Sequence, residues 1–170
     1  MKSSFCSIST QRRRARQLLT AAALLGCAAG MVGAQGGVEP LYVSPHDLKW
    51  VEGPASLPPG AKMAVLQGDP AKEGLFTIRA MLPAGYKIPA HWHPTDENVT
   101  VISGSFGIGM GEKLDSAQGK SMPSGSFVSL PAKCHHFAWI TQPTIIQVHA
   151  MGPFEINYLN PDDDPRKAAK

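Results

Sequence analysis

The sequence is poor in cysteine and in charge. Its 170 residues include three cysteines, Cys6, Cys27 and Cys134, and 17% are Asp, Glu, Lys or Arg. If a leader ending at Ala34 is removed, as argued next, only Cys134 remains, which excludes an intrachain disulfide in the mature chain. Long segments with the 3.6-residue hydrophobic period are also missing after Ala34, so short strands are the expected elements. This length favours one domain.

The first 34 residues have the pattern of a secretory signal peptide. Residues 1–16 contain five Lys or Arg and no acid, and the apolar run "LLTAAALLGCAAGMVGA" follows from Leu18 to Ala34. A basic start, an apolar middle and a small-residue end before Gln35 are typical of such a leader. A membrane anchor is the competing interpretation, but the run is short for a span and contains glycines. We expect a periplasmic or secreted mature protein.

A second interpretation of the leader involves lipid. The letters "LLGC" at residues 24–27 resemble a bacterial lipobox, which would make Cys27 a lipid-bearing N-terminus. Contact with a membrane is expected only in that case. Cleavage after Ala34 and lipidation at Cys27 therefore both remain open.

The charge balance argues against nucleic acid as a partner. The whole chain has 16 Lys and Arg against 13 Asp and Glu, a formal charge of +3. Without the leader, 11 bases stand against 13 acids, a formal charge of −2. Nucleic-acid binding needs a concentrated basic surface, and the mature chain has no such excess.

The rest of the chain predicts an all-β fold. Residues 35–74 are rich in Pro and Gly and hold two short apolar runs, so we expect an arm with one or two strands that packs on the main body. Residues 75–152 contain short runs rich in Val, Ile, Thr and Phe with turn residues between them, a pattern typical of a sandwich or barrel. Residues 153–170 form a C-terminal segment with a charged tail.

One stretch, "GYKIPAHWHPTDENVTVISG", carries candidate metal ligands. On a strand His91 and His93 share a face, and a turn at residues 94–96 lets Glu97 open the next strand beside inward Val99 and Val101. Two imidazoles and a carboxylate in an apolar interior are costly unless a cation compensates them. This predicts a site for one divalent metal ion.

A fourth ligand is expected from "GSFVSLPAKCHHFAWI". Two histidines open a strand there, and His136 shares its face with the small Ala138, whereas His135 lies with Phe137 and Trp139. The face with Ala138 leaves more room, so His136 is the expected ligand. Phe137 and Trp139 are then expected on the opposite side of the strand, behind the pocket.

These two stretches together resemble the cupin family. The first cupin motif, G-x5-H-x-H-x3-E-x6-G, is matched at every defined position from Gly85 to Gly104. The second, G-x5-P-x-G-x2-H-x3-N, is matched at Gly125, Pro131 and His136, but Lys133 replaces its second glycine and Ile140 its asparagine. The resemblance covers about residues 75–151.

The resemblance implies a double-stranded β-helix, that is, a jelly-roll barrel in a single domain, with three histidines and one glutamate on a metal. His91, His93, Glu97 and His136 would be those ligands. The ion could be Fe, Mn, Ni, Cu, Co or Zn, because these suit imidazole and carboxylate donors. Small cupins commonly pair, so a homodimer is also expected.

Four further residues are candidates for the pocket. Phe106 and Met110 lie on the stretch between the motifs, where they could form its walls, and Gln147 and His149 alternate on one face of "TIIQVHAM". Each of them could equally be an ordinary core or structural residue. A small-molecule ligand or substrate is expected in this pocket.

Two function classes remain open from the sequence. The first is a metal-dependent dioxygenase, or a related cupin enzyme, acting on a small oxygenated molecule. The second is a non-catalytic periplasmic protein that binds a metal or a small molecule. Cupins host both classes, so the fold does not choose between them.

Overall fold

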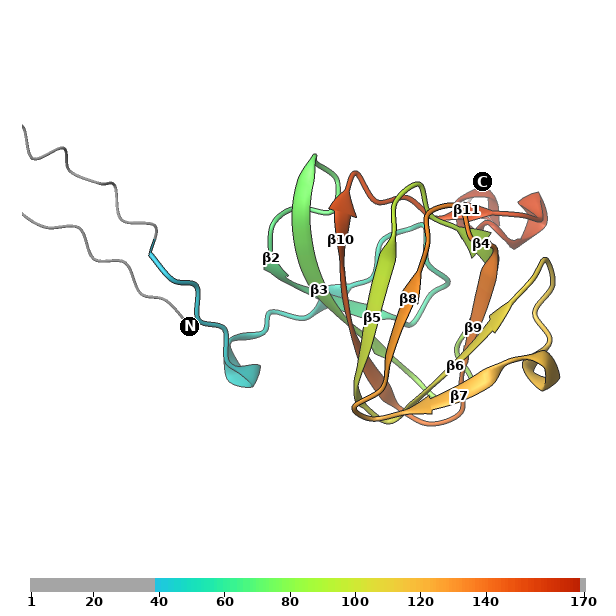
Figure 1. Cartoon of the computed structure of the whole chain (residues 1–170), viewed down its shortest axis with the longest axis horizontal. Coiled ribbons are helices and arrows are strands. Elements are labelled where there is room, and N and C mark those ends of the chain that lie inside the picture. The colour runs from blue at the N-terminus through green and yellow to red at the C-terminus, as the bar shows by residue number, and fades with distance from the viewer. Residues whose placement is uncertain (1–38, 169–170) are drawn as a thin grey trace, which may run out of the picture. The chain divides into compact units, whose positions relative to one another are not determined.

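The computed structural model describes residues 39–168. Within them, eleven strands form two antiparallel sheets that enclose a barrel (Figure 1). The six-stranded sheet has the order β1-β2-β3-β10-β5-β8, and the five-stranded sheet has the order β11-β4-β9-β6-β7. The strands are β1 (Val51–Glu52), β2 (Lys62–Gln67), β3 (Gly74–Leu82), β4 (Lys87–Trp92), β5 (Glu97–Ser103), β6 (Ser105–Met110), β7 (Lys120–Pro123), β8 (Phe127–Leu130), β9 (His136–Ile140), β10 (Thr144–Gly152) and β11 (Asn157–Tyr158). The predicted all-β double-sheet fold is confirmed.

The helical elements are few and short. They are η1 (Pro45–Asp47), η2 (Ser116–Gln118), η3 (Pro161–Asp163) and α1 (Pro165–Ala168). Within residues 39–168, no helix has both the length and the apolar character that a membrane crossing requires. The expected leader, residues 1–34, and the lipidation candidate Cys27 fall outside the described residues.

The longest strand pair lies in the middle of the six-stranded sheet. Strands β3 and β10 pair from Gly74 opposite Gly152 to Leu82 opposite Thr144. Along β3 the buried side chains are every second one, beginning with Phe76 and Ile78. Because successive side chains of a strand point to opposite faces, this alternation gives the sheet one apolar inner face.

The inner faces of both sheets supply one core. Val99 and Val101 of β5 belong to the same buried cluster as Phe106 and Ile108 of β6 and Ile140 of β9. Each large apolar side chain that is fully buried contributes about 1.5–3 kcal/mol by leaving water. The core thus holds together the strands that carry the two motifs.

A second packing layer lies on the outer face of the five-stranded sheet. Trp139 of β9 lies across Gly107 of β6, where an added Cβ would meet the indole ring at 2.2 Å. Phe137 covers Gly109 in the same way, with a closest approach of 2.4 Å. Both aromatic rings therefore point away from His136, as the strand alternation predicts, and the small residues of β6 make room for them.

Residues on both sides of the motif region also join the sheets. Strand β2, from the expected arm, pairs with β3 and places Met63 opposite Ala80. Strand β11, from the expected C-terminal segment, pairs with β4 and places Tyr158 opposite His91. Segments expected to flank the barrel thus form part of its sheets.

Candidate metal centre and its cavity

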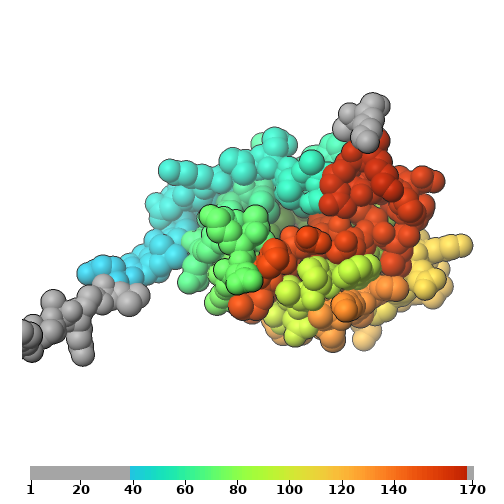
Figure 2. Space-filling view, turned by 90° about the horizontal axis from the view of Figure 1, so that it is seen from above, coloured from blue at the N-terminus to red at the C-terminus, as the bar shows by residue number. Residues whose placement is uncertain are grey.

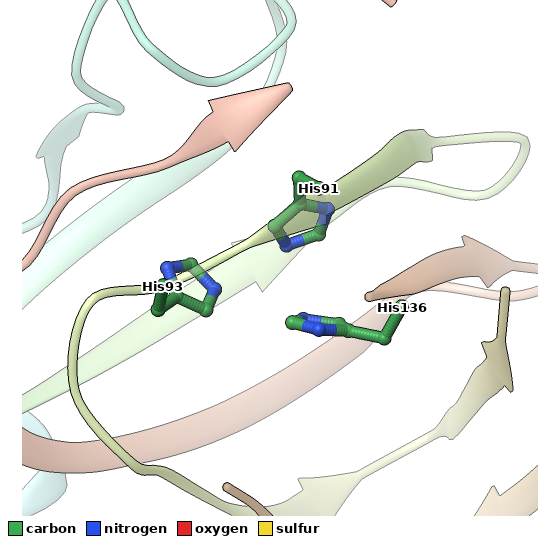
Figure 3. Close-up of side chains that lie close together, drawn as sticks. All are labelled: His91, His93 and His136. Atoms are coloured by element: carbon green, nitrogen blue, oxygen red, sulfur yellow. The ribbon is translucent and has the colours of Figure 1, made fainter. Parts of the chain in front are cut away.

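Three histidines meet inside the barrel. His91 lies in β4 and His93 just beyond its end, so the strand period gives both side chains the same face. His136 opens β9, directly opposite His91 in the sheet. The three rings converge (Figure 3), and one ring nitrogen of each lies within 4.8 Å of the others. All three side chains are buried, whereas His135 is exposed.

Glu97 brings a carboxylate to two of these rings. It is the first residue of β5, after the turn that leaves β4. Its Oε2 atom lies 3.5 Å from Nε2 of His93 and 3.3 Å from Nε2 of His136. The structure therefore brings the four sequence-predicted side chains to one place.

Backbone carbonyls fix the orientation of every ring. The Nδ1 atoms of His91, His93 and His136 lie 2.7, 2.6 and 3.0 Å from the carbonyl oxygens of Pro89, Glu155 and Cys134, respectively. A carbonyl oxygen only accepts hydrogen bonds, so each Nδ1 must carry the proton. A neutral ring then has its lone pair on Nε2, the atom that faces the site.

Burial keeps two of the rings neutral. Burial, together with the neighbouring His136 and His93, lowers the pKa of His91 to about 3. Burial likewise lowers the pKa of His93. Burial alone would raise the pKa of Glu97, but the neighbouring imidazoles, His136 first among them, outweigh it and lower that pKa. At neutral pH the site thus combines the neutral imidazoles of His91 and His93 with the ionised carboxylate of Glu97.

Without a cation, the lone pair on Nε2 of His93 faces the carboxylate oxygen of Glu97. Nε2 of His93 is buried without a hydrogen-bond partner among the described residues, and the nearby atom is an acceptor, Oε2 of Glu97. An unpaired buried polar atom costs about 1–3 kcal/mol, so natural proteins seldom leave one. A cation between the nitrogens and the carboxylate would satisfy all of them. Three imidazoles and one carboxylate fit a divalent transition metal.

A cavity of about 240 Å³ borders the site. Its polar wall includes His91, His93 and Glu97, and Ser56 is the other polar lining residue. The remaining lining residues are apolar: Pro54, Leu57, Met63, Pro70, Ala71, Ile78, Ala80, Leu82, Ile88, Ile146, Val148, Phe154 and Ile156. The arrangement offers a small, mostly apolar cavity beside a set of potential metal donors.

A proline-rich loop, residues 53–60, forms part of the cavity wall. We call this segment the lid loop. The Tyr158 hydroxyl donates to the carbonyl of Ser56 at 2.8 Å, and the Tyr86 hydroxyl donates to the carbonyl of Pro58. The lid loop lies beside the C-terminal segment in space (Figure 2) although about 100 residues separate Ser56 from Tyr158. Two phenols thus hold this wall in place.

The four pocket candidates are not among the lining residues. Phe106 points inward but is 3% exposed within the apolar core, away from the cavity. Met110 ends β6 and is 47% exposed, with its sulfur 3.6 Å from Sγ of Cys134. Neither side chain lines this cavity, and a role of either residue in ligand binding stays a prediction.

Gln147 and His149 point away from the cavity. In β10 they alternate with buried Ile146 and Val148, which do line it. Gln147 instead accepts a hydrogen bond from Nε of Arg79 at 3.1 Å on the outer face of the sheet. Neither residue lines this cavity, because the apolar face of the strand, not the polar one, faces inward, and their pocket role stays a prediction.

Sequence reasoning missed several wall residues. Phe154 stacks on His93 with ring centroids 4.1 Å apart and an interplanar angle of 16°. Leu57 reaches the cavity from the lid loop, and Met63 from β2. No motif marks these positions, because they lie in loops and in a strand outside the two stretches that match the cupin motifs. The inward alternation of Ile146 and Val148 was the one signal that was available.

The fold and the histidine cluster define the class of protein. Two antiparallel sheets that form a double-stranded β-helix, with His-x-His and a third histidine inside, are those of the cupin superfamily. The chain belongs to the family described as "Domain of unknown function (DUF4437)", whose model matches residues 42–157. No curated protein matches the chain.

Solved structures with the same fold are similar at low sequence identity. The polyketide cyclase RemF from Streptomyces resistomycificus has a TM-score of 0.58 at 18% identity, over 75% of this chain and 91% of that one. An acetylacetone dioxygenase from Acinetobacter johnsonii has 0.54 at 16%, over 71% and 78%. An RmlC-like cupin from Shewanella frigidimarina has 0.52 at 13%, over 66% and 91%. At these identities the likeness concerns the fold.

Proposed function

We propose that this cupin binds one divalent transition metal through His91, His93, Glu97 and His136. The observation that carries the proposal is the convergence of three histidine side chains, each oriented by an Nδ1–H bond to a backbone carbonyl, with the Glu97 carboxylate beside two of them. Such hydrogen bonds to the second nitrogen are the usual partners of metal-binding histidines. Glu97 supplies the one formal negative charge among the four donors.

The activity we propose is that of a metal-dependent dioxygenase acting on a small oxygenated molecule. The bound ion would supply Lewis-acid and redox chemistry to oxygen atoms. The residues of this chain would bind and orient the substrate: the apolar wall excludes water, and Phe154 and the carbonyl of Glu155 hold His93. Support comes from the neighbouring acetylacetone dioxygenase fold.

A non-catalytic binding protein is the alternative, and one observation favours it. Apart from the proposed ligands, the lining residues include no titratable side chain, so the cavity wall has no separate general acid or base. Reactions that need such a proton relay are therefore disfavoured. Capture of a metal or a small ligand needs none.

Metal analysis of untagged protein followed by an oxygen-consumption screen separates these possibilities. Diketones, phenols and thiols are offered to protein loaded with each candidate metal in turn. Oxygen uptake that is lost in His93→Ala and retained in His135→Ala supports the dioxygenase. Stoichiometric metal without uptake on any substrate supports the binding protein. Full metal content in all four ligand-to-alanine variants refutes the metal site itself.

We also propose that the mature protein is exported. The support is the acid-free basic leader followed by the apolar run that ends at Ala34. Mass spectrometry of protein from cell fractions tests this. A full-length cytoplasmic species contradicts export, and a diacylglyceryl group on Cys27 points to the lipoprotein form.

We propose a homodimer as the assembly. Strands β1 and β8 lie at the edges of the six-stranded sheet, and exposed edges invite pairing with another chain. Apolar side chains on this sheet are also exposed, among them Leu75 and its cross-strand partner Met151 at 53% and 52%. Light scattering at micromolar concentration is expected to give twice the mass of the mature chain. A monomer mass contradicts the proposal.

A further inference from the structure

The three histidines of the candidate metal centre are not held in the same way. The Nδ1 atoms of His91 and His136 each donate to a carbonyl two residues earlier in the chain. Nδ1 of His93 instead donates to the carbonyl of Glu155, which is 62 positions away. The orientation of His93 therefore depends on a distant part of the chain, whereas the other two rings are fixed locally.

His93 also has less support from its own backbone. It lies just beyond the end of β4 at Trp92, whereas His91 and His136 are paired residues of the sheet. Rotation about χ2 of a histidine has no sharp minima, so the backbone alone does not set the plane of the ring. The hydrogen bond at Nδ1 determines which nitrogen faces the site, and a second contact is needed to define the plane.

Phe154 supplies this second contact. Its ring stacks on the imidazole of His93, with the ring centroids 4.1 Å apart and an interplanar angle of 16°. Because Glu155 is the next residue, the stacked ring and the carbonyl that accepts from Nδ1 come from adjacent positions. We call residues 154–155 the clasp. They lie beyond both of the stretches that match the cupin motifs.

The clasp is itself held by other parts of the fold. The backbone N–H of Phe154 donates to the carbonyl of Pro70 at 2.8 Å. Phe76, which is fully buried in β3, meets the Phe154 ring edge-on with the centroids 5.2 Å apart. Arg166 donates to the carbonyl of Ile156, directly after the clasp, at 3.0 Å. Three separate segments thus anchor the ring and the carbonyl that His93 contacts.

The clasp holds His93 in an orientation that is unfavourable without a cation. Nε2 of His93 is buried and has no hydrogen-bond partner among residues 39–168, and Oε2 of Glu97 lies 3.5 Å away. A buried nitrogen without a partner costs free energy, which a bound metal ion would return. A ring that is already oriented also loses less conformational freedom when the ion binds. Both effects point to a role in metal binding.

We infer that Phe154 is a positioning residue for the metal centre, because together with the carbonyl of Glu155 it orients His93 and thereby sets the metal affinity. The inference rests on the proposed metal site and adds a residue from outside the ligand set. Loss of a contact that orients a metal-binding histidine typically weakens metal binding by about 10–100-fold. The Phe154 side chain also lines the cavity, so the cavity and the metal centre share this residue.

Titration of untagged protein with Co²⁺ tests this role. Phe154→Leu removes the stacked ring and keeps apolar bulk, whereas Phe154→Tyr keeps the ring. Phe106→Leu is the matched control, since it makes the same change at a buried phenylalanine of the apolar core. We expect Phe154→Leu to bind Co²⁺ about tenfold or more weakly, with an altered visible spectrum, and the other two variants to stay within about threefold of wild type.

Nuclear magnetic resonance of the metal-free protein tests the orientation of the ring directly. A buried, hydrogen-bonded Nδ1–H exchanges slowly with water and is detectable, and His93→Gln assigns the signal of His93. We expect Phe154→Leu to lose this signal while those of His91 and His136 remain, which a general loss of stability would not produce. If melting curves show that Phe154→Leu does not fold, Phe154→Met replaces it. A wild-type spectrum without the His93 signal refutes the inference before any change at position 154.

The outcomes separate this inference from the proposed function. Wild-type protein that takes up no Co²⁺ refutes the metal site and the inference with it. Stoichiometric Co²⁺ in wild type with unchanged affinity in Phe154→Leu refutes the inference alone, as does an equal loss in Phe106→Leu or in Phe154→Tyr. Weaker Co²⁺ binding with an unchanged His93 signal, or with the same change in all three histidine signals, also refutes it.

Discussion

The backbone N–H of Lys133 donates to the carbonyl oxygen of His93 at 2.8 Å. This bond joins the turn before His136 to the turn after His93, and both histidines are proposed metal ligands. A second bond reinforces this connection, because Oδ1 of Asp96 accepts from the backbone N–H of Ala132 at 2.7 Å. The two halves of the metal site, which come from different motifs, are held in place by these two bonds.

Lys133 holds this position in an unfavourable backbone conformation. Its φ angle is +63°, and among the described residues it is the one non-glycine residue with positive φ. Residues with a Cβ lose about 1–2 kcal/mol in this region. The second cupin motif has glycine here, and the structure shows that lysine keeps the glycine geometry.

Lys133→Gly is therefore expected to stabilise the protein. Relief of about 1–2 kcal/mol of backbone strain outweighs the roughly 0.5–1 kcal/mol that glycine loses through greater freedom of the unfolded chain. We expect the free energy of unfolding to rise by about 0.5–1 kcal/mol in urea titration. Lys133→Ala, which removes the long side chain but keeps the Cβ, should match wild type. A glycine variant less stable than the alanine variant would contradict the strain argument.

Removal of the Asp96 carboxylate should loosen the same connection. Asp96→Ala is expected to cost about 0.5–1.5 kcal/mol of stability, because an intramolecular hydrogen bond at an exposed position is lost. It should also weaken metal binding, since His93 and Glu97 flank this turn. Asp96→Asn keeps an oxygen acceptor and serves as the control.

Competitive metal titration against a chelating dye measures the second effect. A destabilised Asp96→Ala protein that binds metal as tightly as wild type would show that the turn supports the fold but not the site. Equal loss in the Asn and Ala variants would show that charge, and not the hydrogen bond to Ala132, is what matters.

Two tyrosines make the stability sensitive to alkali. Burial raises the pKa of Tyr86 and of Tyr158, so both phenols stay protonated in the folded chain at a pH where they ionise in the unfolded chain. The unfolded state then binds fewer protons, and stability falls as pH rises above about 10, the ordinary tyrosine value. Below that pH the contribution is complete.

Phenylalanine substitution tests this dependence. Tyr86→Phe and Tyr158→Phe each remove one titrating group and one hydrogen bond to the lid loop. Each variant should be less stable at neutral pH, yet lose less stability than wild type between pH 9 and 11 in urea titrations. Parallel stability–pH curves for wild type and variants would contradict the assignment.

The histidines should make the metal-free protein sensitive to acid. The pKa of His91 is lowered to about 3, whereas in the unfolded chain it is near 6.5. The unfolded state therefore binds the extra proton first, so this part of the stability is complete above about pH 6.5 and is lost as pH falls toward 3. Urea titrations of apo wild type and apo His91→Gln across this range should converge at low pH. Curves that stay parallel would contradict this.

The convergence of the candidate ligands could be predicted because strand geometry determines their orientation locally. His91 and His93 share a face by the period of two, and the choice of His136 over His135 followed from the small neighbour Ala138. Both arguments use residues that are close in the sequence. The structure places all of these side chains as the alternation requires.

The cavity could not be predicted in the same way. Its walls combine the lid loop, β2, β10 and the segment around Phe154, which meet only in the folded chain. Gln147 and His149 have side chains suited to a pocket, but the alternating apolar Ile146 and Val148 are the stronger indication of which face of the strand points inward. Phe106 has the correct orientation, but strand alternation does not reveal which inward residues border a cavity and which pack in the core.

Trp139 and Phe106 test which side chains of the five-stranded sheet face the interior of the barrel and which face outward. Trp139 lies on the outer face over Gly107 and is half-buried, so Trp139→Ala is expected to cost about 2 kcal/mol, less than the roughly 3–5 kcal/mol of a fully buried aromatic residue. Phe106→Ala should lower the free energy of unfolding by about 3–5 kcal/mol, because Phe106 is buried in the core.

Neither substitution should remove the metal, since neither side chain touches the four proposed ligands. Calorimetric melting gives the stability, elemental analysis gives the metal content, and titration of a diketone from the oxygen-consumption screen gives the ligand affinity. Leu57→Ala is the positive control, because it enlarges the cavity and should change diketone affinity while the metal stays bound. A Trp139→Ala protein that melts like wild type but no longer binds the diketone would place the indole on the inner side of β9 and reverse the assignment of the strand's two faces.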